Sequence, residues 1–441
     1  MLNVLKHRGY RHMFLAQTVA LLGTGLATVA LGLLAFDLSG DQAGLVLGTA
    51  LTIKMVAYVT LAPIASAFAE QMNRRTMLVL LDVIRAGVAL CLPFVNEIWQ
   101  VYVLIFLMQA ASAGFTPTFQ ATIPDLLPDE EDYTKALSLS RMAYDLENLL
   151  SPMLAAALLS LVTFDALFMG TSVGFVASAA LIVTIALPSP KPSKRRGIWD
   201  RTTRGLRIYL ATPRLRGLLA LCMTLSLVGA MVLVNTVVVI RADLNLDETT
   251  VAFALGSFGA GSMFAALFLP RFLQALTDRP VMMFGAALMS ITALVLAGWS
   301  YLLALSLPAV LTAWFLIGLG YSTVLTPSGR LLRRSSRPED RPALFAAQFT
   351  LSHACWLVTY PLSGWLISTF DATITLLTLG SGGMISLTIA LILWPNRDPE
   401  VVEHYHPDLP PEHPHLQDGH NHPYVIDDLH RRWPGHHQTY R

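Results

Sequence analysis

Closely spaced histidines near the carboxyl terminus are the first residues whose types and spacing could do chemistry. Nine of the chain's twelve histidines lie in residues 395–441, and several are separated by a single residue. Residues two apart in an extended chain point the same way at about 7 Å, so such a pair can bring two imidazoles to one cation. Imidazole with nearby carboxylate suits Ni²⁺, Co²⁺, Zn²⁺ and Cu²⁺. The candidate metal ligands are His404, His406, His413, His415, His420, His422, His430, His436 and His437.

This tail predicts binding of a divalent metal without choosing among these ions. Prolines spread along it disfavour a helix. The alternative interpretation is a solvated terminus whose histidines bind nothing.

Charged residues inside apolar runs form the second group, because a charge in hydrocarbon is costly and indicates function by default. They are Lys54, Asp82, Arg85, Arg141, Asp145 and Glu147. Asp82 precedes Arg85 by three residues, which predicts an ion pair on one helix face. Arg141 precedes Asp145 by four residues, with the same consequence. The remaining two charges have no such partner and are the better candidates for function.

The composition indicates a membrane protein. Of 441 residues, 54% are hydrophobic and 13% are charged, against roughly a quarter charged in ordinary soluble domains. This scarcity of charge excludes an ordinary soluble enzyme, and a net charge of +1 provides no field to attract nucleic acid. No glycine-rich phosphate loop interrupts the apolar runs, which argues against an ATP-driven pump. We expect a multi-span protein in membrane lipid that is not an enzyme.

Stretches of about 20 apolar residues predict twelve membrane-spanning helices, since backbone polar groups in lipid must bond within their own segment. The predicted spans are 13–36, 43–65, 76–95, 99–122, 136–162, 166–187, 216–240, 250–272, 281–299, 302–325, 342–369 and 373–394. We therefore expect an all-α membrane protein of two six-helix pseudo-repeats. Its expected parts are an N-terminal bundle (1–187), a basic cytoplasmic linker (188–215), a C-terminal bundle (216–394) and a histidine-rich cytoplasmic tail (395–441).

Basic residues predict the orientation, because Lys and Arg are retained on the cytoplasmic side. The loops that would share one side hold Arg74, Arg75, Lys135, residues 191–207, Arg279 and residues 330–337. The opposite loops hold acids such as Asp41 and Glu97, and Arg241 is their one base. Both termini are expected in the cytoplasm.

A faint repeat links the two halves. Pro-Asp-Glu at 128–130, before the fifth predicted span, is echoed by Pro-Glu-Asp at 338–340, before the eleventh. Within those spans Ser-Pro at 151–152 is answered by Tyr-Pro at 360–361. Such symmetry is typical of secondary transporters built from related halves.

With this architecture, residues 1–394 resemble the major facilitator superfamily of secondary transporters. Residues 66–75 resemble the family's signature loop between spans two and three in its acid and its two terminal arginines, without its glycines and first arginine, and Glu70, Arg74 and Arg75 become conformational-gate candidates. The antiporter motif of its fifth span is similar to residues 147–156, with Glu147 in place of a glycine. In the family this motif marks exporters, so the resemblance implies a proton-coupled exporter that works by alternating access.

The histidine-rich tail makes the chain resemble the bacterial nickel-resistance exporters of the NreB type. That resemblance implies a monomer in the bacterial inner membrane that exports a divalent metal, nickel before cobalt or iron, and exchanges it for protons. The metal is substrate, and no cofactor is expected. One alternative is export of an amphipathic organic compound such as a drug or siderophore, and another is a metal sensor without transport.

The resemblance also assigns positions. In the family, spans 1, 4, 7 and 10 line the cavity while spans 2 and 5 meet spans 11 and 8, which implies that Lys54 faces span 11 and Glu147 faces span 8. Proton coupling needs a group that is neutral in one access state and ionised in the other. We predict Glu147 for this role and Asp145 next, the alternative being that Glu147 only bonds hydroxyls across the seam. The substrate-path candidates are Lys54, Gln109, Gln120, Asn235, His353 and Tyr321.

The residues that line the cavity would distinguish the two export hypotheses. A metal exporter predicts carboxylates or imidazoles that converge on one point. An organic exporter predicts aromatic walls without a convergent ligand set.

Overall fold

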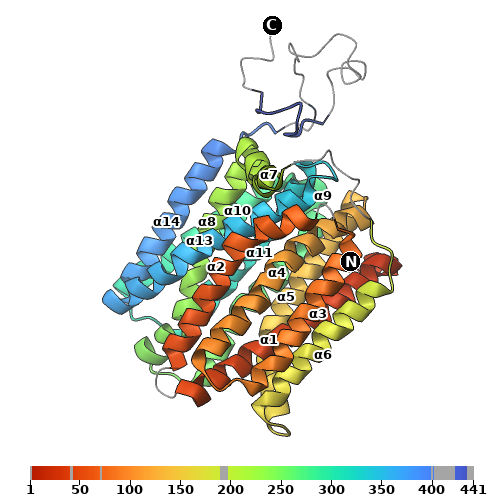
Figure 1. The fold of residues 1–441 in the computed structure, drawn as a ribbon. Coiled ribbons are helices and arrows are strands. Elements are labelled where there is room, and N and C mark those ends of the chain that lie inside the picture. The colour runs from red at the N-terminus through yellow and green to blue at the C-terminus, as the bar shows by residue number, and fades with distance from the viewer. Residues whose placement is uncertain are drawn as a thin grey trace, which may run out of the picture.

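The computed structural model describes residues 2–39, 43–69, 72–188, 197–398, 401 and 423–434. Within these ranges the backbone is helical or irregular, apart from one isolated bridge between Val401 and Pro423. Long helices lie side by side in a single bundle (Figure 1). The prediction of an all-α protein is confirmed.

Each predicted span corresponds to one long helix. In the first half these are α1 (Arg8–Ser39), α2 (Ala43–Ala69), α3 (Arg74–Cys91), α4 (Ile98–Leu126), α5 (Glu130–Leu159) and α6 (Phe164–Val183). In the second half they are α8 (Pro213–Val238), α9 (Glu248–Ala275), α10 (Asp278–Leu302), α11 (Leu307–Leu325), α13 (Arg341–Thr369) and α14 (Ala372–Leu393). Short turns of helix extend three of them, at η1 (Leu2–Lys6), η3 (Leu92–Phe94) and η4 (Val239–Asp243).

Two further helices lie where the sequence predicts loops. The expected linker contains α7 (Ile198–Ala211), and α12 (Ser328–Arg334) joins α11 to α13. Helix α7 is amphipathic, with Ile208 and Tyr209 buried and Trp199 exposed. Its many charges keep it below the hydropathy of a span, which is why the search for apolar runs missed it.

Polar side chains fix where several spans begin. The side chains of Asp129, Asp247 and Asp371 each accept a hydrogen bond from a backbone N–H in the first turn of α5, α9 and α14, at 2.8 to 2.9 Å. Asn73 does the same for α3. These N-caps satisfy donors that a helix cannot satisfy internally, so the short loops between spans are defined by sequence.

Ten of the described helices are long and apolar enough to cross a membrane. Helices α5 and α13 are equally long, at 30 and 29 residues, but carry more polar residues. Both lie where the halves meet, α5 against α1 and α9, and α13 against α2 and α8. These two more polar spans are therefore among those that contact both halves.

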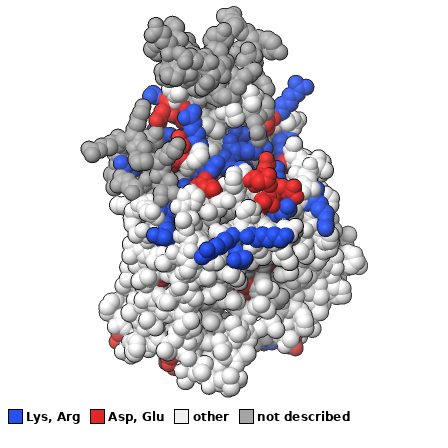
Figure 2. All heavy atoms as spheres, turned by 90° about the vertical axis from the view of Figure 1, so that its right-hand side faces the viewer, with Lys and Arg blue, Asp and Glu red and all other residues white. Residues whose placement is uncertain are grey.

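Charges gather at one end of the bundle, which we call the basic end. It is the end at which α1 and α13 begin and α2 and α14 end, and it also carries α7 and α12. Figure 2 shows Lys, Arg, Asp and Glu crowded there above a broad uncharged belt, with a few acidic atoms at the opposite end. This distribution fits a helical bundle whose uncharged belt faces lipid.

The two halves are joined at the basic end by arginines of the second half. Arg330 forms an ion pair with Glu130 at 2.6 Å and donates to Thr134 Oγ1 at 2.9 Å. Arg333 donates to the carbonyl of Pro128. Arg341 pairs with Asp125, which is also bonded to Arg74 of the first half. The bundle is therefore closed at the basic end in this conformation.

Close helix packing in the second half depends on two glycines. A Cβ atom on Gly261 of α9 would overlap the carbonyl of Phe315, and one on Gly318 of α11 would overlap the carbonyl of Phe258. Backbone atoms cannot move aside as a flexible side chain can. The α9–α11 contact is consequently possible only with glycine at both positions.

We expect Gly318→Ala and Gly261→Ala each to destabilise the protein by about 1–3 kcal/mol, the usual cost of overpacking. Gly259→Ala is the matched control, because a Cβ there meets nothing within 4 Å. The measurement is the thermal unfolding of the detergent-purified protein. Equal melting temperatures for Gly259→Ala and Gly318→Ala would contradict this account of the packing.

Candidate functional site

A cavity of about 540 Å³ lies in the middle of the bundle. The first half supplies most of its wall, from α1, α2, α4 and α5, while α11 and α13 close the opposite side. A volume in this range suits a small organic molecule. The cavity is thus the natural place to look for the residues that the sequence singled out.

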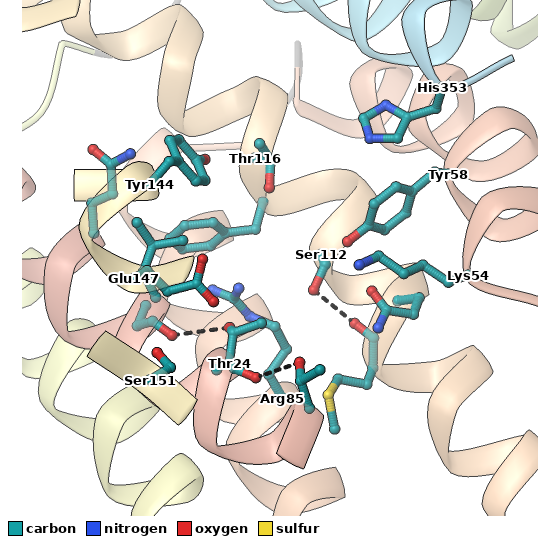
Figure 3. Close-up of a pocket in the computed structure, with 18 of the residues that line it drawn as sticks. Thr24, Lys54, Tyr58, Arg85, Ser112, Thr116, Tyr144, Glu147, Ser151 and His353 are labelled. Atoms are coloured by element: carbon teal, nitrogen blue, oxygen red, sulfur yellow. Dashed lines mark hydrogen bonds between the residues drawn. The ribbon is translucent and has the colours of Figure 1, made fainter. Parts of the chain in front are cut away.

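Lys54 of α2 and Glu147 of α5 point into this cavity from opposite sides (Figure 3). Neither forms a direct ion pair with another described residue, although Lys54 Nζ lies 5.7 Å from the centre of the Tyr58 ring. The two opposite charges nonetheless attract each other across the cavity. They are therefore available to a bound molecule or to a proton.

Glycine brings Glu147 close to α1. A Cβ on Gly25 would overlap the side chain of Ser151 and would lie 3.1 Å from Glu147 Oε1. Ser151 Oγ is buried and makes no hydrogen bond with a described residue. Gly25 therefore allows the polar face of α5 to approach α1 at the cavity wall.

The expectation that Glu147 faces the eighth span is wrong. Asp145 is the residue that faces it: Ser262 of α9 donates to Asp145 Oδ2 at 2.7 Å and accepts from Arg141 Nε at 3.1 Å. Residues two apart on a helix differ by about 200° in direction. Asp145 and Glu147 must therefore point to opposite sides, toward the seam and toward the cavity.

The two pairs predicted from spacing are present. Arg141 pairs with Asp145 within α5, and its guanidinium lies 5.0 Å from the centre of the Tyr321 ring. In α3, Arg85 pairs with Asp82. Ser178 of α6 also donates to Asp82 Oδ2 at 2.7 Å.

Asp82, Arg85 and Asp145 are buried and the Arg141 side chain is 11% exposed, so each charge is neutralised by its partner where it lies. The guanidinium of Arg85 also stacks on Phe115 and Phe175, at 4.0 and 4.4 Å from their ring centres. A cation that already has a carboxylate and two aromatic faces is firmly held. Arg85 is thus a fixed part of the cavity wall.

Aromatic side chains make up much of the wall. They are Tyr58, Phe115, Phe119, Tyr144, Phe175, Tyr321, Trp356 and Tyr360. The rings of Trp356 and Tyr360 lie 4.9 Å apart at a tilt of 40°, and the end of the Trp356 ring packs against Gly229 of α8. Such walls bind large apolar surfaces of a ligand.

His353 stands among these rings. Its Nδ1 atom lies 2.7 Å from the carbonyl oxygen of Phe349, and its ring contacts Tyr58 edge-on at 4.9 Å. Only the other ring nitrogen remains for a ligand. The described part of the chain contains no group of three His, Cys, Asp or Glu side chains that could hold a metal ion.

A second cavity of about 350 Å³ lies between the first and the basic end. It shares Tyr58, Tyr144, Tyr321 and Trp356 with the first, and continues along α5, α11 and α13 toward their basic ends. Gly329 of α12, which touches Tyr133 and Leu137, lies at its far wall. A ring of aromatic side chains thus separates a central chamber from a chamber beside the closed end.

The other predicted residues are placed as follows. Gln109 lines the central chamber, Gln120 the second, and Tyr321 both. Asn235 lines neither, because it is fully buried against α13 and donates to Ser363 Oγ at 2.9 Å. Its role is to join two helices of the second half.

The gate candidates lie at the basic end. Arg74 is buried and paired with Asp125, whereas Arg75 is exposed in the first turn of α3. Glu70 lies outside the described residues. Of the nine tail histidines only His430 is described, and its Nδ1 atom lies 2.9 Å from Asp427 Oδ1.

Sequence reasoning identified Tyr321 and missed the other aromatic residues of the wall. A signal was present, because Tyr144, Glu147 and Ser151 on α5 have the same i, i+3, i+7 spacing as His353, Trp356 and Tyr360 on α13. Residues at this spacing share one helix face. The same pattern on α5 and α13 marks the faces that meet at the cavity.

Relatives among curated proteins are distant transporters. The chain is 24% identical over 271 residues to an uncharacterized MFS-type transporter, YfiS, of Bacillus subtilis, covering 59% of this chain and 63% of that one. It is 23% identical over 177 residues to macrolide efflux protein A of Streptococcus pyogenes, covering 39% and 43%. The matched stretches span less than two thirds of either relative.

Solved structures share the fold. The human organic anion transporter MFSD10 superimposes with a TM-score of 0.74 at 14% identity, covering 87% of this chain and 99% of that one. A bacterial homologue of the iron transporter ferroportin, in an outward-facing state, gives 0.73 at 13% identity with the same coverage. The family model described as Major Facilitator Superfamily matches residues 13–234 and 219–413. Its match extends over nearly the whole bundle, and the chain belongs to the Major Facilitator Superfamily.

Proposed function

We propose that the protein is an exporter of an amphipathic organic compound, coupled to protons and working by alternating access. The observation that carries this proposal is the aromatic wall of the central chamber, where Lys54 and Glu147 lie on opposite sides and form no ion pair with another described residue. A relative named as a macrolide efflux protein supports export of an organic compound. The bacterial relatives support a place in a bacterial cell membrane, which is the inner membrane where a cell has two.

The orientation follows from the basic end. Lys and Arg concentrate on the cytoplasmic side of membrane proteins, so the basic end faces the cytoplasm and both termini lie there. In this conformation the contacts between the halves at the basic end separate the central chamber from the cytoplasm. Loading from the cytoplasm requires the contacts of Arg330, Arg333 and Arg341 with the first half to separate.

Divalent metal as the substrate, with nickel first, has less support from the cavity. On the described wall of the central chamber, Glu147 is the only carboxylate and His353 the only imidazole. One ring nitrogen of His353 already faces a backbone carbonyl. Asp82 lies outside the wall and is paired with Arg85. A transition-metal site needs several such ligands around one point. The nickel hypothesis therefore rests on the tail histidines, eight of which lie outside the described residues.

Glu147 is the residue we assign to proton coupling. Its carboxylate borders the chamber without a direct ionic partner, whereas Asp145 is held by Arg141 and Ser262. A substrate group that contacts Glu147 competes with a proton for the same carboxylate. Competition at one site exchanges substrate for protons, with the monomer as the working unit.

Export of an organic compound is tested by accumulation in bacterial cells that express the protein. We expect lower accumulation of amphipathic compounds, in a panel that includes the macrolide erythromycin, and unchanged accumulation of Ni²⁺. Trp356→Ala should change which compounds are exported, because it removes part of the chamber wall. Trp365→Ala, on the same helix but 55% exposed, is the matched control. Lower Ni²⁺ with an unchanged organic panel would reverse the choice of substrate class.

Proton coupling is tested with Glu147→Gln, which keeps the shape and hydrogen bonding of the side chain but cannot ionise. In vesicles, proton-driven accumulation of a transported compound should fall to the level of vesicles without protein, while downhill exchange survives. Glu131→Gln makes the same change on an exposed turn of α5 and should transport normally. Proton-driven transport by Glu147→Gln at the wild-type rate would show that another group carries the proton.

A further inference from the structure

Two arginines at the basic end are buried deeply enough to need counter-charges. Arg204 of α7 is 7% exposed and Arg214 of α8 is 1% exposed. Arg204 pairs with Asp340 and, at 2.9 Å, with Asp428. Arg214 pairs with Asp398 at 3.2 Å. A buried charge without a partner is strongly destabilising, and Asp398 and Asp428 both come from the chain after α14.

Residues 424–433, which we call the clip, form a compact unit of their own. Asp427 Oδ1 accepts hydrogen bonds from the backbone N–H groups of Leu429 and His430, at 2.8 and 2.7 Å. The hydroxyl of Tyr424 donates to the carbonyl of Arg432 at 2.7 Å, and its ring meets Trp433 edge-on at 5.2 Å. These contacts give the segment a fixed shape without a regular helix.

The clip is docked on the second half. Tyr424 and Ile426 are buried in the same apolar cluster as the core of that half. Asp427 forms an ion pair with Arg337 at 2.7 Å, and Trp433 lies 5.1 Å from the Arg214 guanidinium. With the Arg204–Asp428 pair, the clip contacts α7, the start of α8 and the loop before α13. Figure 1 shows it at the same end of the bundle as α7.

The charges of this interface persist at neutral pH. Burial alone would raise the pKa of Asp427, but hydrogen bonds from His430 and the charge of Arg337 outweigh it and hold the pKa well below its usual range. Burial alone would lower the pKa of Arg204, but Asp340 and Asp428 outweigh it and raise the pKa. Docking therefore joins ionised partners of opposite sign.

Helix α7 lies across the seam between the halves. It contacts α13 of the second half and α2 of the first. A Cβ on Gly205 of α7 would overlap the carbonyl of Ala343, so α7 sits directly on the start of α13. There Asp340 pairs with Arg204, and the next residue, Arg341, pairs with Asp125 of the first half. The clip thus fastens α7 beside the contacts that close the basic end.

We infer that the basic face formed by Arg204, Arg214 and Arg337 is a docking surface for the chain's own clip, and that docking stabilises the conformation closed at the basic end. Opening the basic end moves the second half away from α2. Helix α7 must then lose its contact either with α13 of the second half or with α2 of the first. A docked clip holds α7 on the second half and over the seam. Release of the clip lowers the free energy needed to open the basic end. The docked clip therefore slows the loading of substrate from that end.

The experiment uses the full chain and needs no substrate, so its outcome is independent of the proposed function. Cys222 is buried in the wall of the second chamber, beside the closed end. In a background where Cys91 and Cys355 are replaced by serine and alanine, a membrane-impermeant maleimide is added only on the side of the membrane that the basic end faces, and it labels Cys222 when that end opens. The labelling rate therefore reports how often the basic end is open.

We expect Asp428→Asn combined with Trp433→Ala to raise the labelling rate several-fold. Arg431→Gln, which changes an exposed charge within the clip, is the matched control and should leave the rate unchanged. Asp428→Asn alone leaves Arg204 paired with Asp340, so this variant weakens clip docking without leaving a buried arginine unpaired, and we expect it to fold. Asp428→Glu should restore the slow rate.

The inference would be overturned if Asp428→Asn and the combined Asp428→Asn, Trp433→Ala variant were both labelled at the rate of the protein with an unchanged clip. A slower rate would overturn it as well, because it would mean that the docked clip favours the open end. Thermal unfolding of each variant, measured in parallel, distinguishes a faster rate caused by opening from one caused by global unfolding.

Discussion

The cost of placing a charge in a low-dielectric interior governs this structure. Almost every charge buried in the described bundle has a counter-charge at hand: Asp82 with Arg85, Arg141 with Asp145, and the arginines of the basic end with acids of several elements. Removing one partner of such a pair is strongly destabilising. Lys54 and Glu147 are different, because they face each other only across the central chamber. A bound molecule can therefore change the electrostatic interaction between Lys54 and Glu147 without breaking a contact between helices.

The same constraint explains why the ends of the bundle differ. Arginines concentrated at the basic end would repel one another if they were not matched by acids, and their partners come from three places. Glu130 and Asp125 belong to the opposite half, Asp340 to the same half, and Asp428 to the tail. Partners from the opposite half close the chamber, whereas the partner from the tail ties down the linker helix. The arginines of the basic end thus orient the protein in the membrane, close the chamber at that end and bind the tail.

The fold could be predicted from the sequence because apolar runs of spanning length leave few alternatives to helices. Ion pairs within one helix were also predictable, since i,i+3 and i,i+4 spacing is a local property. The direction of Glu147 was not, because it depends on how α5 packs against α1 and α9, whose contacting residues lie more than a hundred residues away in the chain. The docking of residues 424–433 was likewise invisible: it depends on arginines of α7 and α8 whose burial appears only in the folded protein.

The central claim is that Lys54 and Glu147 act as one coupled pair across the chamber. It is tested most directly by a double-mutant cycle on the purified protein, with Lys54→Met, Glu147→Gln and the double variant compared by free energy of unfolding. We predict that the effects of the two single changes do not add, and that the cycle gives a favourable coupling energy of at least about 1 kcal/mol between the two charges. Effects that add to within about 0.5 kcal/mol would show independent side chains and contradict the account.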